Sequence, residues 1–268
     1  AYHHINDETT DNVYGTTSTG AQLRFGLPVT RDLTASLFTG IDQTVITDKI
    51  APKSKFFTDG QQLNKAWVGY SLTLDTLDDN KHPTEGLYAT LQQQYDGLSY
   101  NFIKTEAKAR YFMPLFPDAG LVGSIKGQAG IINTFGASGI NPVEAFNYGG
   151  TLVRGFQAGN TGPRIGTQAV GYTEYAGASA EVEFPIPMLP ETYGLHGAIW
   201  ADAAVIGGQG ASGALDANSV DQPLKSAVGA SIIWDSPFGP LRGDVAYVIS
   251  KATSDKTQLF SLTLQTLL

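Results

Sequence analysis

Hydrophobic and polar residues alternate with a period of two along most of the chain, in segments of about ten residues separated by turn residues. Val68, Tyr70 and Leu72, for example, alternate with the small or polar residues Gly69 and Ser71. Such alternation is typical of strands whose two faces meet different surroundings. It predicts a strand tail at 1–5 and eleven strands, at 21–27, 33–42, 65–75, 87–94, 103–113, 121–131, 178–184, 195–205, 225–235, 241–249 and 260–268.

The segments between these strands differ in length. Most of the longer connections alternate with short ones, which lie at 28–31, 78–86, 117–120, 185–194 and 237–240. The longest, 133–175, exceeds the ~15 residues beyond which a loop without structure of its own is usually functional or disordered. Short turns at one end and longer loops at the other are typical of outer-membrane β-barrels. No segment has a convincing helical pattern.

Composition favours the same fold class. Charged residues make up only 16% of the 268 residues, below the ~25% of ordinary soluble domains, and no apolar run reaches the ~18 residues of a membrane helix. One face of 103–113 carries four charged residues, which suits a water-filled barrel interior; they are Lys104, Glu106, Lys108 and Arg110. We therefore predict an all-β chain that forms a transmembrane antiparallel β-barrel surrounded by the lipid bilayer.

Several other kinds of protein are excluded or disfavoured. A net charge of −8 argues against a nucleic-acid partner, and the lack of cysteine excludes a thiolate metal site. The four histidines suggest no metal site. His196 and Asp202 stand six residues apart on one predicted strand, too far apart at ~3.3 Å per residue for direct hydrogen bonding. We expect no enzymatic activity, no catalytic residue and no cofactor.

The longest loop contains a glycine-rich stretch, Gly149 to Arg164, with Arg154 between Val153 and Gly155. Its glycines neither follow a buried strand nor open a helix, so it does not fit the phosphate-binding motifs. Taken alone, the stretch is compatible with a surface loop whose arginine is solvated.

The sequence Val153-Arg154-Gly155-Phe156-Gln157, followed by Gly162-Pro163, resembles the signature of the sixth extracellular loop in the BamA family of outer-membrane assembly barrels. Three further stretches resemble the family in order and spacing, namely 180–185, 197–203 and 234–242. The chain departs from the family at Gly243, where an aromatic residue is usual, and at Leu268, where Phe or Trp is usual.

The resemblance implies that residues 1–268 are a partial C-terminal barrel domain, with about twelve strands present of a family sixteen-stranded barrel. The first four strands and the periplasmic POTRA domains would be absent. The pattern agrees, because the sequence starts and stops with open strands, and a bilayer does not tolerate unpaired strand edges.

The implied function is the insertion and folding of β-barrel proteins in the bacterial outer membrane. The implied partners are unfolded outer-membrane proteins and assembly-machine lipoproteins, the latter bound through the absent POTRA domains. A TamA-like barrel or a two-partner secretion transporter would share the loop arginine and is an alternative. A passive porin is another, because the charged face of 103–113 could line a pore.

The resemblance also implies site residues. In the loop motif of Val153, Arg154, Gly155 and Phe156, the arginine would fold into the barrel lumen and pair with Glu183 and Asp202. The alternation independently places both carboxylates on the lumen face, and an arginine fork can hold two carboxylates.

The last strand, 257–268, would form one side of a lateral gate at which substrate strands add to an exposed edge. The gate residues expected in it are Phe260, Leu262, Leu264 and Leu268.

Overall fold

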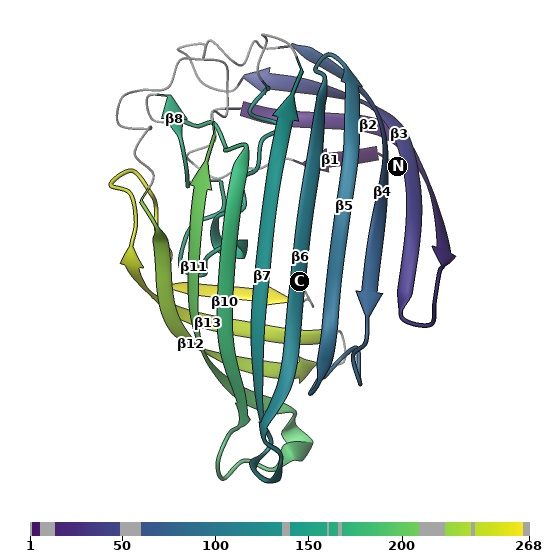
Figure 1. The fold of residues 1–268 in the computed structure, drawn as a ribbon. Coiled ribbons are helices and arrows are strands. Elements are labelled where there is room, and N and C mark those ends of the chain that lie inside the picture. The colour runs from purple at the N-terminus through teal and green to yellow at the C-terminus, as the bar shows by residue number, and fades with distance from the viewer. Residues whose placement is uncertain are drawn as a thin grey trace.

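The computed structural model describes residues 2–5, 14–48, 60–135, 140–159, 161–165, 168–208, 223–236 and 239–264. Twelve strands form one antiparallel sheet in the order β1-β2-β3-β4-β5-β6-β7-β10-β11-β12-β13-β14 (Figure 1). They are β1 (Tyr2–Ile5), β2 (Tyr14–Pro28), β3 (Leu33–Asp48), β4 (Gln62–Asp75), β5 (Gly86–Leu98), β6 (Phe102–Phe116), β7 (Leu121–Thr134), β10 (Glu174–Pro185), β11 (Leu195–Gly207), β12 (Lys225–Ser236), β13 (Gly239–Ser250) and β14 (Phe260–Leu264). Each predicted strand and the tail at 1–5 thus corresponds to an observed strand, and residues 265–268 of the last predicted strand lie outside the described residues.

Within this sheet every strand pairs with the next one along the chain, except that β7 pairs with β10 because β8 and β9 form a separate hairpin. The loop between these two strands leaves and returns at the same place in the sheet. It is the segment expected as a long loop at 133–175, and it contains the small hairpin of β8 (Arg164–Ile165) and β9 (Gln168–Ala169).

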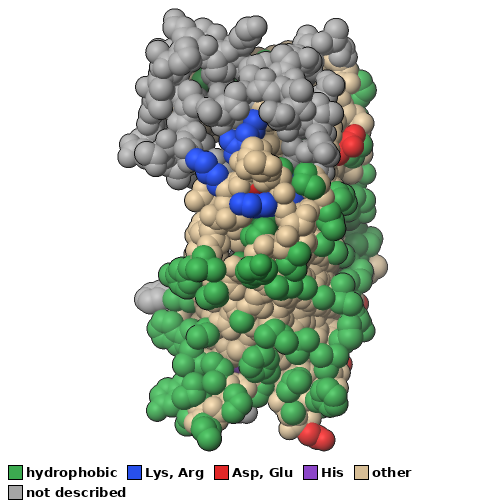
Figure 2. All heavy atoms as spheres, turned by 90° about the vertical axis from the view of Figure 1, so that its left-hand side faces the viewer, with side chains coloured by type: hydrophobic (Ala, Val, Ile, Leu, Met, Phe, Trp, Pro, Cys, Tyr) green, Lys and Arg blue, Asp and Glu red, His purple; other side chains and the backbone are tan. Residues whose placement is uncertain are grey.

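The sheet is curved, so that β12, β13 and β14 run at a steep angle to β4–β7 (Figure 1). Its outer face is apolar, with exposed side chains such as Leu23, Ile125 and Val245, and Figure 2 shows hydrophobic side chains spread over much of one side of the molecule. Its inner face carries buried charged residues, among them Glu181 and Arg242. The predicted division into an apolar and a polar face, which defines a membrane β-barrel, is confirmed.

Some strands are longer than the alternation predicted. β2 begins at Tyr14 rather than at residue 21, and β3 continues to Asp48 rather than ending at residue 42. The added part of β2 is rich in Thr, Ser and Gly, which give no contrast between faces, although Thr favours strands. Polarity alone therefore misplaced these ends.

The described helices are three short 3-10 turns, η1 (Pro117–Ala119), η2 (Gly149–Thr151) and η3 (Glu191–Tyr193). None of the helices in the described ranges is long and apolar enough to cross a membrane.

The main cluster of buried residues lies between the long loop and the inner face of the sheet. It joins Leu152, Val153 and Phe156 of the loop to Phe102 of β6 and Trp200 of β11, among others. The loop therefore packs against the concave side of the sheet instead of projecting into solvent.

Candidate functional site

Hydrogen bonds within the loop hold the segment that precedes Arg154. Phe146 and Tyr172 form an antiparallel bridge across the loop, and the backbone N–H of Tyr148 donates to the Tyr172 hydroxyl at 3.0 Å. Gly149 and Gly155 have φ values of +46° and +92°, which L side chains rarely adopt. These two glycines allow the chain to reverse so that the arginine between them points at the sheet.

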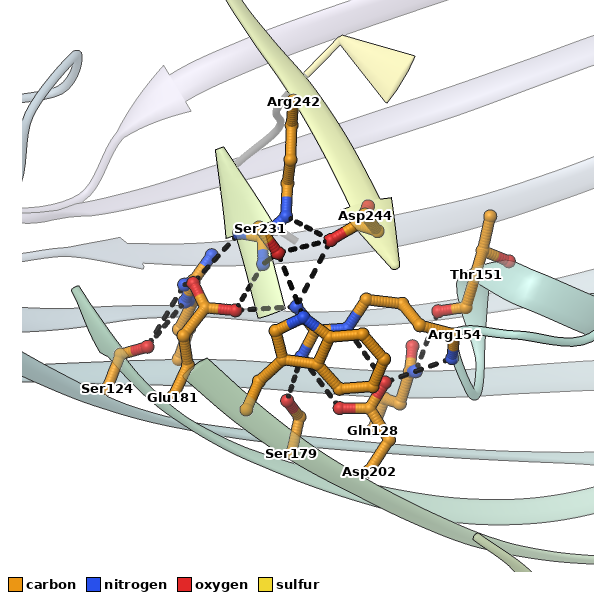
Figure 3. Close-up of polar contacts among 12 residues, drawn as sticks. Ser124, Gln128, Thr151, Arg154, Ser179, Glu181, Asp202, Ser231, Arg242 and Asp244 are labelled. Carbon is orange, nitrogen blue, oxygen red and sulfur yellow. Dashed lines mark hydrogen bonds and ion pairs between the residues drawn. The ribbon is translucent and has the colours of Figure 1, made fainter. Parts of the chain in front are cut away.

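Arg154 is held by Asp202 of β11 through both its backbone and its side chain (Figure 3). The Arg154 backbone N–H donates to Oδ2 at 3.0 Å, Nε donates to Oδ2 at 2.8 Å, and Nη2 donates to Oδ1 at 2.7 Å. A bidentate pair of this kind is among the stronger and more directional hydrogen-bonding arrangements. It fixes the position of the loop backbone as well as the direction of the guanidinium.

The second carboxylate at Arg154 belongs to Glu181 of β10. Arg154 Nη1 donates to Glu181 Oε2 at 2.5 Å. Arg242 of β13 donates from Nη1 to Oε1 at 2.9 Å and from Nη2 to Oε2 at 2.7 Å. Arg110 of β6 donates to Oε1 at 3.1 Å. One buried carboxylate therefore joins three arginines from the loop and from two distant strands.

Glu183 was expected to pair with Arg154, but it lies elsewhere. The carboxylate that pairs with Arg154 is that of Glu181, so the prediction of Glu183 was wrong. Glu183 Oε1 is 3.9 Å from His196 Nδ1. In the register of β10 and β11, Ser179 lies opposite Asp202, whereas Glu183 lies opposite Ala198, nearer the connecting turn. Residues 179, 181 and 183 share a face of β10 because they are two apart. Alternation therefore identified the face but not which position along the strand lies beside Arg154.

An aromatic ring covers the arginine. The Arg154 guanidinium carbon lies 3.8 Å from the centroid of the Trp200 ring, a geometry that favours a cation. The Trp200 indole N–H donates to Ser231 Oγ at 2.9 Å. Its ring lies over Gly229 of β12, where an added Cβ would come within 2.3 Å of it. The glycine thus makes room for the ring that stacks on Arg154.

The charges of this cluster balance. Three arginines, Arg110, Arg154 and Arg242, face three carboxylates, Glu181, Asp202 and Asp244. An unpaired buried charge is expensive, so removal of one member leaves its partners uncompensated. Burial lowers the pKa of Arg154, but the hydrogen bonds and charge of Asp202 outweigh it, and the net shift is upward.

Sequence reasoning did not identify Glu181, Arg242 and Asp244 as members of the charged cluster around Arg154. A signal was present, because Arg242 and Asp244 flank Gly243 in a predicted strand and so share one face. That face could not be connected to Arg154 without knowing how the sheet curls.

A second contact region holds the first half of the loop. The hydroxyl of Tyr148 donates to Glu106 of β6, and the hydroxyl of Tyr175 donates to the same carboxylate oxygen at 3.0 Å. The rings of Phe146 and Tyr175 pack edge to face, with centroids 4.8 Å apart. Burial raises the pKa of the loop phenols Tyr148 and Tyr172, so both remain neutral. Tyr148 can therefore donate to Glu106, while the Tyr172 hydroxyl accepts the N–H of Tyr148.

The arginine cluster borders a cavity of about 500 Å³ on the inner side of the sheet. Lys108 and Lys126 contribute from β6 and β7, and Ser261 and Thr263 contribute from β14. No group of metal-ligating side chains suitable for an ion was found in the described part of the chain. The arginine cluster therefore anchors the motif loop on the polar inner side of the sheet.

The last strand, β14, pairs with β13 from Phe260 to Leu264. The side chains of Phe260, Leu262 and Leu264 are exposed on the outer face. Along the described residues β14 has one neighbour in the sheet, β13. Leu268 lies outside the described residues.

Comparison with known proteins identifies the family. Residues 2–266 match the Omp85 superfamily domain. The chain belongs to the Omp85 superfamily. This agrees with the family expected from the 153–157 motif, and it covers almost the whole sequence.

The curated relatives of this Omp85 chain include bacterial and eukaryotic proteins. It is 32% identical over 212 residues to the outer membrane protein assembly factor BamA of Neorickettsia risticii, a match that covers 78% of this chain and 28% of the relative. It is 26% identical to BamA of Neisseria meningitidis, covering 94% of this chain and 36% of the relative. A SAM50-like protein of Drosophila melanogaster is 31% identical over 44% of this chain and 27% of its own length. The chain thus spans about a third of the length of these relatives.

Solved structures share the fold of this Omp85 chain. BamA from Haemophilus ducreyi lacking POTRA domains 1–3 superposes with a TM-score of 0.79 at 19% identity, over 96% of this chain and 56% of that one. CdiB from Escherichia coli superposes with a TM-score of 0.63 at 14% identity, over 93% of this chain and 44% of that one. Both likenesses support the barrel architecture.

Proposed function

We propose that this chain is the barrel part of a protein that inserts and folds β-barrel proteins in the bacterial outer membrane. The observation that carries the proposal is the anchored loop: Arg154 of the motif is bound by Asp202 and Glu181 on the inner face of an Omp85 barrel. The relatives by sequence support the same activity, because two are named as outer membrane protein assembly factors.

We propose that substrate strands are received at the edge of β14 that faces away from β13. An unpaired strand edge presents a row of backbone donors and acceptors that another strand can bind. The partner would be an unfolded outer-membrane protein whose strands pair with this edge. The apolar outer face, with Leu262 and Leu264 on β14, would keep the growing sheet in contact with lipid.

Other partners would bind outside this chain. The solved BamA structure lacks the POTRA domains 1–3 of that protein, and we propose that assembly-machine lipoproteins bind such domains in the complete protein. The barrel itself would act without a cofactor and without covalent chemistry, since strand addition requires only exchange of hydrogen bonds and burial of apolar surface.

The test is reconstitution of the full-length protein in liposomes. An unfolded outer-membrane protein is added, and its folding is followed by resistance to protease and by its shifted mobility on unheated gels. The proposal expects faster folding than in empty liposomes, and slower folding with Arg154→Ala than with the parent protein. Release of small trapped solutes without any acceleration of folding would support the passive porin instead.

The transporter alternative makes a different prediction in the same liposomes. A two-partner secretion barrel would move a soluble passenger across the membrane and would not accelerate folding of an unrelated barrel protein. The likeness to CdiB concerns the fold alone, at 14% identity, whereas the named assembly factors match by sequence. Assembly is therefore the function that the comparisons favour.

A further inference from the structure

The motif loop pairs by its backbone with the segment that leads into β14. Phe156 and Thr257 form an antiparallel bridge. The N–H of Gln157 donates to the carbonyl of Lys256 at 3.0 Å, and the N–H of Gln258 donates to the carbonyl of Gly155 at 2.8 Å. This pairing of 155–157 with 256–258, named the clasp below, begins one residue after Arg154 and ends two residues before β14.

The clasp fits tightly against the wall of the barrel. A Cβ added to Gly155 would come within 2.8 Å of Ala246 Cβ and 3.1 Å of Val248 Cγ2, both on β13. Phe156 is 3% exposed. Because Gly155 is a glycine with positive φ, the loop backbone can come close enough to receive the Gln258 N–H.

A buried ion pair secures the same connection from the other side. Asp255 accepts a hydrogen bond from Lys225 of β12 and another from the N–H of Ala252 at 2.8 Å. The Asp255 carboxylate also lies 3.4 Å from the N–H of Gly162, further along the motif loop. Lys225 and Asp255 are 2% and 4% exposed. The connection between β13 and β14 is thus tied both to the loop and to β12.

We propose that the clasp positions the start of β14, so that anchorage of Arg154 on Asp202 and Glu181 sets the position of the strand that receives substrates. The role of β14 in receiving substrates rests on the proposed function. The coupling between Arg154 and the start of β14 is a property of the barrel and does not depend on that function. The rigid path is short: Arg154 fixes Gly155, Gly155 binds Gln258, and Gln258 is followed after one residue by Phe260 of β14. Release of the arginine would free the start of β14 as well as the loop.

The experiment uses the full-length protein in lipid, with spin labels at the outward-facing positions Ile125 of β7 and Leu262 of β14. Four other strands lie between them in the sheet. The five spacings of ~4.8 Å would place the two strands about 24 Å apart if the sheet were flat. Pulsed electron spin resonance measures the distribution of this distance. Gln258→Pro removes the N–H that binds Gly155, and Gln258→Ala is the matched control because it keeps the N–H while losing the same side chain.

The parent protein and Gln258→Ala are expected to give one narrow distance, and Gln258→Pro and Arg154→Ala to lose it. Asp255→Asn, which weakens the ion pair with Lys225 and keeps the Gln258 N–H in place, should broaden the distance as well and serves if the proline variant does not fold. Identical distributions in Gln258→Pro, Asp255→Asn and Gln258→Ala would overturn the proposal.

Folding of substrate in liposomes separates this inference from the proposed function. A broadened distance in Gln258→Pro with unchanged assembly would uphold the clasp and count against a gating role for β14. Slower assembly in Gln258→Pro with an unchanged distance would overturn the clasp while leaving the insertase function in place.

Discussion

Asp202 binds Arg154 at the backbone N–H, at Nε and at Nη2 at the same time, so one carboxylate fixes both the main chain and the side chain of the motif residue. Arg154→Lys tests whether the fork matters beyond its charge. Lysine keeps the charge but cannot reproduce a bidentate pair together with the bond to Glu181. We expect the loop to become sensitive to protease added outside the membrane. Protection equal to that of the parent would show that charge alone suffices.

Glu181 and Glu183 share a face of β10 but differ in their contacts, which makes them a matched pair of targets. Glu181→Gln would leave three arginines without their shared carboxylate, and loss of one partner of a buried ion pair typically costs ~3–5 kcal/mol. We expect a clearly lower midpoint of thermal unfolding in detergent and slower substrate folding. Glu183→Gln should have a much smaller effect, since Glu183 lies 3.9 Å from His196 and does not contact the motif arginine. Equal effects would contradict the assignment of Glu181.

Gly155 has φ +92° and lies against β13. In Gly155→Ala the backbone would be strained at this positive φ, at a cost of ~1–3 kcal/mol, and the added methyl group would press on Ala246. We expect a lower unfolding midpoint and weaker protection of the loop. Gly127→Ala is the control, because an added Cβ there meets nothing within 4 Å. A Gly155→Ala protein as stable as Gly127→Ala would be incompatible with the close packing described.

Asp78, in the turn between β4 and β5, makes a local prediction about pH. Its carboxylate accepts hydrogen bonds from the N–H groups of Thr84 and Glu85 and from the Thr84 hydroxyl. Slight burial acts to raise the pKa of Asp78, but these bonds outweigh it and lower the pKa from 3.8 to about 2. Because the ionised form is favoured, the bonds are fully present above the ordinary pKa and are lost as the pH falls through about 2.

The amide resonance of Thr84, followed by NMR in detergent micelles, should therefore titrate at about pH 2. Asp78→Asn should abolish this titration without disturbing residues near Arg154. A midpoint close to 3.8 would mean that the carboxylate is not bound in the turn.

The sequence predicted the strands because a membrane barrel separates its faces cleanly, and alternation reports that separation. It located the ends of the long loop to within a residue or two, at Thr134 and Glu174. It misplaced the start of β2 because Thr, Ser and Gly read as polar on both faces. The choice between Glu181 and Glu183 depended on the register of β10 against β11, which is set by the turn that joins them and is invisible to periodicity.

The partners from β6 and β13 were beyond sequence reasoning for another reason. Arg110 and Arg242 reach Glu181 only because the sheet curls and brings strands that are not neighbours together. The clasp between 155–157 and 256–258 joins segments about a hundred residues apart through backbone atoms, which carry no residue identity at all.

The most direct measurement is a double-mutant cycle at Arg154 and Asp202, with substrate folding by the full-length protein in liposomes as the readout. If the two residues act as a unit, Arg154→Ala and Asp202→Ala should each slow folding by about tenfold, equivalent to ~1.4 kcal/mol. The double variant should then be no slower than either single variant, since the interaction can be lost only once. Single effects that multiply in the double variant, or three variants as fast as the parent, would contradict the account that the anchored loop is required for barrel insertion.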